Sequence, residues 1–304
     1  MLFLVILAAL VLVLFTGIPV FTGLTLFAAA ILVGVEGNLG NLGEIVFGKL
    51  DSYLLVAIPL FTLMAHFMIR GKVVNDLYDT AHTLLRHLPG GLAVATVAAC
   101  TIFAAISGSS VATALTIGSA AIPQMLRYGY APRVAYGVVG AGGTLGILIP
   151  PSAPMVLFGV VSDTSIGALF MAGVVPGLMM AALFAVYCAW SATGKSAGRE
   201  KRASLDEALA AIRKSIWSLS LPPLILGGMY FGVFTATEAA GAGALAALLI
   251  ATLVYRSLDL RGILDAARDA ARTSAMLFMI LIGAALFGHV LTKLRIPAQL
   301  VDLV

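Results

Sequence analysis

A short polar segment interrupts one of the most apolar parts of this sequence. Residues 104–113 read AAISGSSVAT and lie within an uncharged run that extends from 90 to 126. A helix that stops at this segment leaves backbone carbonyls without partners, and these suit a small hard cation. A helix that restarts just after it presents free N–H groups and the positive end of its dipole, which suit a carboxylate. The segment therefore predicts neighbouring sites for a cation and an acid.

A second segment of unusual composition reads GAGGTLGILIPPSAP and covers residues 140–154. Pro150 and Pro151 have no N–H, so they free carbonyl groups of the preceding turn. We expect a helix over 134–161 to unwind around 143–150 and to restart with Pro151 and the following serine in its first turn. A kinked helix without a ligand is the alternative. A dinucleotide-binding loop does not fit, because its third glycine is missing and no soluble strand precedes it.

The two segments supply one set of candidate ligands, which the surrounding apolar runs would place deep inside a membrane. Ligands for the cation, mostly backbone carbonyls, are expected from Ser107, Gly108, Gly143, Thr144, Gly146 and Pro150. Hydroxyls and amides for the acid are expected from Ser109, Ser110, Thr113 and Ser152. The alternative is that the serines only cap two half-helices and allow close helix packing. Capping alone does not explain why a helix breaks there.

Composition identifies the elements that must position these residues. The 304 residues are 61% hydrophobic and 11% charged, far from the usual values of a soluble domain. The apolar runs lack the alternation of barrel strands, so the expected class is an all-α polytopic membrane protein. The first run has no basic n-region and is interpreted as a span rather than a signal peptide. We place spans of 16 to 29 residues near 1–16, 18–35, 52–69, 134–161, 165–193, 216–233, 236–255 and 273–292.

Basic residues in the connections set the expected orientation. The connection 194–215 carries six lysine and arginine residues, so the positive-inside rule places it in the cytoplasm and the N-terminus in the periplasm. The run 90–126 is too long for one span and fits a re-entrant hairpin of two half-helices of roughly 15 residues. An amphipathic arm over 71–88 precedes it.

The charge count favours this hairpin. Of the 18 basic residues only Lys49, Lys293 and Arg295 then lie outside, and the other 15 lie inside. The net charge of +4 therefore indicates membrane topology and no nucleic-acid partner.

Two pairs of similar segments predict an inverted repeat. FTGIPVFTGLTLFAAAILVG from Phe15 resembles FTATEAAGAGALAALLIATL from Phe234, and the segment from Ser52 resembles the one from Ser274. The offsets are 219 and 222 residues, and the two copies have opposite orientations in this topology, as in many secondary transporters.

The repeat divides the chain into a first copy over 1–193, a connector over 194–215 and a second copy over 216–304. Counterparts of the two polar segments would fall beyond Val304. The second repeat is therefore expected to be incomplete in this sequence.

Two capping boxes are predicted outside the candidate site. Glu238 lies in an apolar run, where a charge is often functional, yet the sequence TATE at 235–238 fits a capping box equally well. SLDE at 204–207 predicts the start of a short cytoplasmic helix that ends with Arg213 and Lys214.

The sequence resembles the large membrane subunit, of DctM type, of a tripartite ATP-independent periplasmic (TRAP) transporter. The resemblance covers nearly the whole chain and rests on LFTGIP, AIPLF, RHLPGGLAVA, FAAISGSSVATA, IPQMLRYGY, GTLGILIPPS, LFMAGVVPGL and GVFTATEAAGAGALAALL, in that order. It implies a bacterial inner-membrane permease with the elevator-type fold of the ion-transporter superfamily. The family's second hairpin and its second broken helix, with a TPP-type motif, would follow residue 304.

The resemblance also implies the transported species and the partners. The coupling ion would be Na⁺, and the substrate a small organic acid such as a C4-dicarboxylate or a sugar acid. The partners would be a small four-helix membrane subunit, a periplasmic substrate-binding protein and the lipid bilayer. No organic cofactor and no enzyme activity are expected.

Three rival functions remain open from the sequence. The first is a sodium/dicarboxylate symporter of the same architecture that works without a binding protein. The second is an intramembrane serine hydrolase, which would need a base at the depth of the serines, whereas His66 lies near the cytoplasmic end of its span. The third is a structural membrane scaffold.

Overall fold

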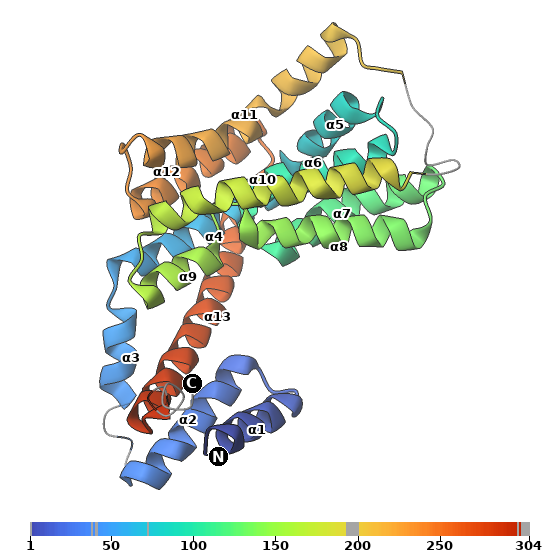
Figure 1. Cartoon of the computed structure of the whole chain (residues 1–304). Helices are drawn as coiled ribbons and strands as arrows, with labels where there is room; N and C mark the ends of the chain where they lie inside the picture. Colours follow the sequence, from blue (N-terminus) through green and yellow to red (C-terminus); the bar gives the residue numbers. More distant parts are fainter. Residues whose placement is uncertain are drawn as a thin grey trace. The chain divides into compact units, whose positions relative to one another are not determined.

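The computed structural model describes residues 2–37, 39, 42–71, 73–192, 201–296 and 298, and every regular element in them is a helix (Figure 1). Within these ranges, five helical segments are long and apolar enough to cross a membrane: Tyr53–Arg70, Pro132–Ser162, Ile166–Trp190, Ala236–Val254 and Leu260–Lys293. This agrees with the expected class of polytopic membrane protein. Three basic residues that the predicted topology counts as cytoplasmic, Lys72, Lys195 and Arg199, lie outside the described residues, as does the first part of the connector, 194–200.

The chain forms two compact units, Met1–Tyr53 with Arg272–Val304 and Leu54–Ala271. The first unit contains α1 (Leu2–Phe15), α2 (Val20–Glu36), α3 (Leu42–Leu50) and the end of α13 (Leu260–Lys293). Its apolar centre joins Ala28 and Leu32 of α2 to Leu286 and Val290 of α13. The helix α3 lies in a connection where the sequence predicted no element.

The second unit carries all candidate site residues. Its elements in chain order are the rest of η1 (Tyr53–Val56), α4 (Ala57–Arg70), α5 (Val73–Leu85), α6 (Gly91–Ser107), α7 (Ser110–Arg127), α8 (Pro132–Leu148), α9 (Ala153–Ser162), α10 (Ile166–Trp190), α11 (Leu205–Tyr230), α12 (Ala236–Leu249), η3 (Ile250–Val254) and the first part of α13.

Helix α6 forms the centre of the second unit. It packs against α5, α7, α8 and α10, and Figure 1 shows α6, α7, α8 and α10 side by side. Ala95, Ala99, Cys100 and Phe103 of α6 are fully buried. Small residues on α6 let neighbouring helices approach closely, as is common in membrane proteins. This packing holds both polar segments inside one unit.

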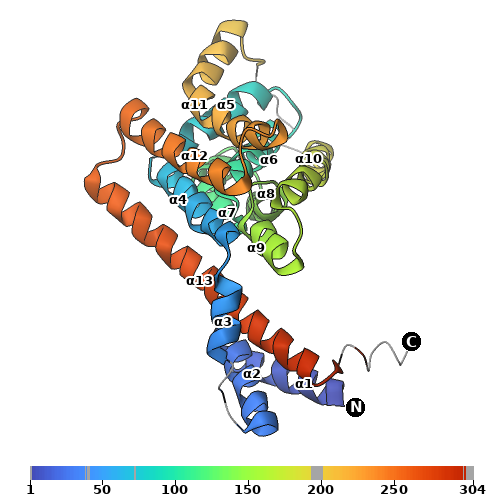
Figure 2. The ribbon, with the colours of Figure 1, turned by 90° about the vertical axis from the view of Figure 1, so that its left-hand side faces the viewer.

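A second close pair in this unit is α4 with α12 (Figure 2). A Cβ added to Gly243 of α12 would lie 2.7 Å from Met64 Sδ of α4, so a larger residue there would require the Met64 side chain to shift. At the end of α4, Ser257 Oγ donates a hydrogen bond to the Gly71 carbonyl at 2.6 Å.

Polar contacts attach the arm helix α5 to α11. Thr80 Oγ1 donates to the Ala211 carbonyl at 2.9 Å and lies 2.7 Å from Ser215 Oγ, which donates to the Asp76 carbonyl at 2.8 Å. Lys214 Nζ lies 2.6 Å from Asp76 Oδ1, and this hydrogen-bonded pair raises the pKa of Lys214 above its usual value.

The structure corrects the predicted connector. The capping box at Ser204 and Glu207 forms as expected, but the helix that it begins does not end at Arg213 and Lys214. It continues as α11 to Tyr230, because no stop signal follows Lys214. The segment 256–272, between the predicted spans 236–255 and 273–292, is helical from Leu260, where α13 begins.

Glu238 is a capping residue in the structure. Its carboxylate accepts hydrogen bonds from the Thr235 N–H and hydroxyl, both at 2.8 Å, while the Glu238 N–H donates to Thr235 Oγ1. The side chain is exposed at the start of α12. The capping interpretation of TATE is therefore confirmed.

The hydroxyl of Thr80 should stabilise the second unit. We predict that Thr80→Val lowers the unfolding free energy by about 1–2 kcal/mol, since it removes a buried hydrogen bond between α5 and α11. Thr83→Val is the control, because that exposed hydroxyl bonds only to its own helix at Asp79. Thermal unfolding of the purified variants measures the difference, and equal midpoints would contradict the assigned role.

Candidate functional site

The first polar segment forms the turn of a helical hairpin. Helix α6 ends at Ser107, Gly108 has the left-handed φ of 59°, and α7 begins at Ser110. Thr96 Oγ1 donates to Met125 Sδ at 3.8 Å, so the outer parts of the two helices are adjacent and α7 runs back along α6. The arms have 17 and 18 residues, longer than the expected 15. An arm of 17 residues is about 26 Å long.

The hydroxyls at the tip differ in their partners. Ser107 Oγ lies 2.9 Å from Thr113 Oγ1, and both side chains are buried. Ser109 is the N-cap of α7, and its Oγ accepts from the Ala112 N–H at 3.3 Å. The buried Ser110 Oγ finds no partner among the described residues. A buried hydroxyl without a partner costs free energy, so capping does not account for Ser110.

The second polar segment forms the interruption between α8 and α9, but not where the sequence predicted it. Residues 143–148 remain helical, and the interruption covers Ile149–Ser152, with Pro151 and Ser152 before the new helix rather than in its first turn. The helix ends at Leu148 and Ile149 is extended, because proline disfavours the helical conformation of the residue before it. The peptide bond between Pro150 and Pro151 is cis.

This interruption leaves specific carbonyls without helical donors. The Ile149 N–H still donates to the Leu145 carbonyl at 2.8 Å. Pro150 and Pro151 cannot donate to the next two carbonyls, those of Gly146 and Ile147. Ser152 Oγ replaces the missing donor of Pro151 and donates to the Ile147 carbonyl at 2.9 Å. The Gly146 carbonyl is thus the one freed by Pro150.

The two interruptions contact each other through backbone. A Cβ added to Gly108 would overlap the Pro151 carbonyl oxygen. A Cβ on Gly146 would lie 2.5 Å from the carbonyl carbon and oxygen of Ser109, and one on Gly143 would lie 2.8 Å from Ala114 Cβ. The glycines therefore provide close approach, and the sequence alone did not predict this contact or the part that Pro151 and Ala114 have in it.

The structure brings most of the predicted residues together. The residues within or beside this contact are Ser107, Gly108, Ser109, Ser110, Thr113, Gly143, Gly146, Pro150 and Ser152. Thr144 differs, since its side chain is exposed and its hydroxyl donates to the Ala141 carbonyl of its own helix at 2.7 Å.

The chemistry of the site is that of backbone and hydroxyl oxygen. None of its side chains titrates, and within the described ranges no group of three or more His, Cys, Asp or Glu residues could hold a metal ion. In the same part of the chain no histidine hydrogen-bonds to the tip serines. The hydrolase interpretation therefore gains no nucleophile–base pair.

Comparison with known proteins identifies the family. Residues 5–304 match the family described as "Tripartite ATP-independent periplasmic transporter, DctM component". The chain belongs to this family, as its motifs predicted. Members are transport proteins and not enzymes, and this chain is accordingly an integral membrane protein of a transporter family.

Three relatives illustrate the range of the family. The chain is 42% identical to the C4-dicarboxylate TRAP transporter large permease protein DctM of Pseudomonas aeruginosa, in an alignment that covers 90% of the chain and 64% of that protein. It is 36% identical to the ectoine TRAP transporter large permease protein TeaC of Halomonas elongata, in an alignment that covers 91% of the chain and 66% of that protein. It is 33% identical to the sialic acid TRAP transporter large permease protein SiaM of Vibrio cholerae, in an alignment that covers 95% of the chain and 68% of that protein. The chain thus spans about two thirds of the length of these relatives.

The contact between the interruptions should be sensitive to one methyl group. We predict that Gly146→Ala lowers the unfolding free energy by about 1–3 kcal/mol, because the added Cβ would overlap the Ser109 backbone. Gly140→Ala is the matched control on α8, since nothing lies within 4 Å of its added Cβ. Thermal unfolding of both purified variants measures the effect. If Gly146→Ala were as stable as Gly140→Ala, the close contact would be refuted.

Proposed function

We propose that this chain forms part of a permease subunit that imports small organic acids by Na⁺-coupled secondary transport. The observation that supports it most is the contact of two interrupted helices through Gly108, Pro151, Gly146 and the Ser109 backbone. Helix ends inside a membrane carry unpaired polar groups, which are tolerated where they line a site. Discontinuous helices of this kind bind ions and substrates in secondary transporters.

The Na⁺ ligands are proposed to be backbone carbonyls at the two interruptions. The last turn of α6, at Ser107 and Gly108, and the Gly146 carbonyl freed by Pro150 are the best placed. Gly143 contributes close packing, and Thr144 would have to turn its hydroxyl away from Ala141 to bind an ion.

The substrate carboxylate is proposed to bind at the start of α7. Ser110 Oγ has no partner there, and the first N–H groups of α7 and its dipole favour an anion. Ser109 is proposed to bind through its amide, while its hydroxyl caps α7. Thr113 and Ser152 are fully buried and already bonded, so they support the backbone around the site.

An inverted repeat and elevator-type transport are proposed for the architecture. In the first unit α2 packs on the end of α13, and a Cβ on Gly283 would lie 3.2 Å from Leu24 Cβ. In the second unit α12 packs on α4, with Gly243 beside Met64. Leu24 corresponds to Gly243 at the offset of 219 residues, and Phe61 corresponds to Gly283 at the offset of 222. Phe61 lies one helical turn from Met64. Each copy therefore pairs its second span with the third span of the other, as two-fold symmetry requires.

The energy source and the partners complete the proposal. One charge moved inward gains about 2.3 kcal/mol per 100 mV of membrane potential, so transport needs no ATP. The chain would lie in the bacterial inner membrane with its N-terminus periplasmic and residues 194–215 cytoplasmic. It would work with a small four-helix membrane subunit and a periplasmic binding protein. Its substrate would be an organic acid, as the name of the DctM relative suggests.

A sodium symporter that needs no binding protein is the second candidate, because the contact of two interrupted helices would serve it equally. Reconstitution of the complete transporter into vesicles separates the two. We predict that uptake requires both an inward Na⁺ gradient and the binding protein. Uptake in choline medium at the same rate would refute the coupling ion, and uptake without the binding protein would favour the symporter.

Two serine variants separate ligand from cap in the same assay. Ser110→Ala should leave thermal stability unchanged or higher, because an unpartnered buried hydroxyl is lost, while uptake falls at least tenfold. Ser109→Ala should lower stability by about 1 kcal/mol through loss of the cap. Normal uptake by Ser110→Ala would support the structural interpretation of the serines.

A further inference from the structure

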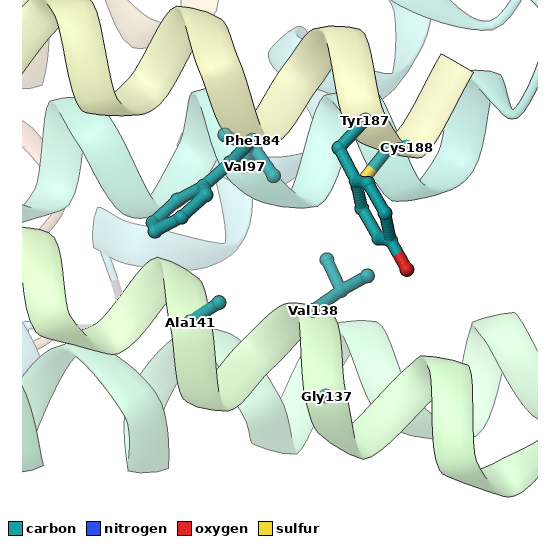
Figure 3. A pocket seen from close by; sticks show the side chains of 7 residues that line it. All are labelled: Val97, Gly137, Val138, Ala141, Phe184, Tyr187 and Cys188. Atoms are coloured by element: carbon teal, nitrogen blue, oxygen red, sulfur yellow. The ribbon is translucent and has the colours of Figure 1, made fainter. Parts of the chain in front are cut away.

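An apolar crevice lies between α8 and α10, away from the contact of the two interruptions (Figure 3). Its volume is about 70 Å³. Its walls include Val97 of α6, Gly137, Val138 and Ala141 of α8, and Phe184 and Tyr187 of α10. Figure 3 shows the rings of Phe184 and Tyr187 reaching from α10 toward α8. The proposed transport mechanism does not use this crevice.

The crevice is open because of one glycine and has a basic residue at one end. No atom lies within 4 Å of a Cβ added to Gly137, so the space above this glycine is free. Arg133 precedes it by one helical turn and lies on the same face of α8, because residues four apart share a face. The Tyr187 hydroxyl points away from Phe184 and toward the first turns of α8 (Figure 3).

Exposed aromatic side chains place this end of the crevice at headgroup level. Tyr136 of α8 and Tyr187 and Trp190 of α10 are all more than half exposed. Tyrosine and tryptophan gather where hydrocarbon meets headgroups, since their rings are amphipathic. Arg133 lies within one turn of this level.

The charges at this end favour an anion. Neither α8 nor α10 contains an acidic residue, and no ion pair joins Arg133 to the described residues. Helix α8 begins near Arg133 without a side-chain cap, and the positive end of its dipole lies there. An apolar crevice with a cationic end matches a molecule with an acyl chain and a phosphate.

We propose that an anionic glycerophospholipid binds here, with one acyl chain over Gly137 and Ala141 and its phosphate at Arg133 and the Tyr187 hydroxyl. In the topology proposed above, this lipid belongs to the cytoplasmic leaflet. A helix is about 10–12 Å wide with its side chains, so a crevice of about 70 Å³ cannot hold one. Part of a flexible acyl chain fits such a space while its headgroup remains in the interface.

Native mass spectrometry of the purified chain with added palmitoyl-oleoyl phosphatidylglycerol tests the proposal. The wild type should bind this lipid at least tenfold more tightly than phosphatidylcholine of the same chains. Arg133→Gln should weaken binding by about tenfold or more, as loss of a charge-assisted hydrogen bond predicts. Tyr187→Phe removes only the hydroxyl and should weaken binding a few-fold.

A matched pair of glycine variants tests the crevice itself. Gly137→Leu should fill the crevice without a clash and abolish tight binding, while Gly140→Leu should bind like the wild type. Gly140 lies on the same helix, also in open space, but does not line the crevice. Both leucines favour the helix, so thermal stability should not fall.

The overturning results are equally specific. Equal binding by Gly137→Leu and Gly140→Leu, or equal binding of the two lipids, would overturn the proposal. So would a second polypeptide that co-purifies, blocks lipid binding and is released by Gly137→Leu, because the crevice would then hold a protein side chain. Loss of Na⁺-coupled uptake is not among the readouts, so the lipid site and the transport proposal fail separately.

Discussion

A polar backbone inside an apolar environment is the constraint on which this structure depends. Each helix end carries N–H or carbonyl groups that no water can satisfy within hydrocarbon. In this chain two helix ends lie against each other. Gly108 and Gly146 have no side chains, so the tip of the hairpin lies directly on the interruption between α8 and α9. Gly108, Pro150, Pro151 and Ser152 are buried at this contact.

The rest of the second unit maintains this contact. Helix α6 is buried among α5, α7, α8 and α10 and fixes the hairpin within the unit. The polar contacts of Thr80 and Asp76 attach α5 to α11, so the base of the hairpin is tied to the helix after the connector.

The sequence predicted local features well where one residue type determines the backbone. Gly108 suits a left-handed φ and Ser109 suits an N-cap, so the turn of the hairpin was located correctly. Both capping boxes also formed. The interruption after α8 was predicted too early, because the missing donors of Pro150 and Pro151 suggested an unwound turn before them, whereas residues 143–148 remain helical in close packing.

The sequence did not predict the individual tertiary contacts. Nothing in the sequence indicates that Gly146 faces the Ser109 backbone or that Ser152 bonds to the Ile147 carbonyl. The length of α11 was also missed, because charge at Arg213 and Lys214 was interpreted as a helix end although no glycine or proline follows at once. Propensity is a weak guide where neighbouring helices determine the outcome.

Amide hydrogen exchange of the purified protein in lipid nanodiscs tests the central claim most directly. If the two interruptions form one cation site, Na⁺ should slow exchange at residues 108–112 and at Ile149 and Ser152 together, and K⁺ at equal concentration should not. Protection of both segments by Na⁺ alone is the predicted result. Unchanged exchange in both, or equal protection by K⁺, would contradict a Na⁺ site at the contact of the two helices.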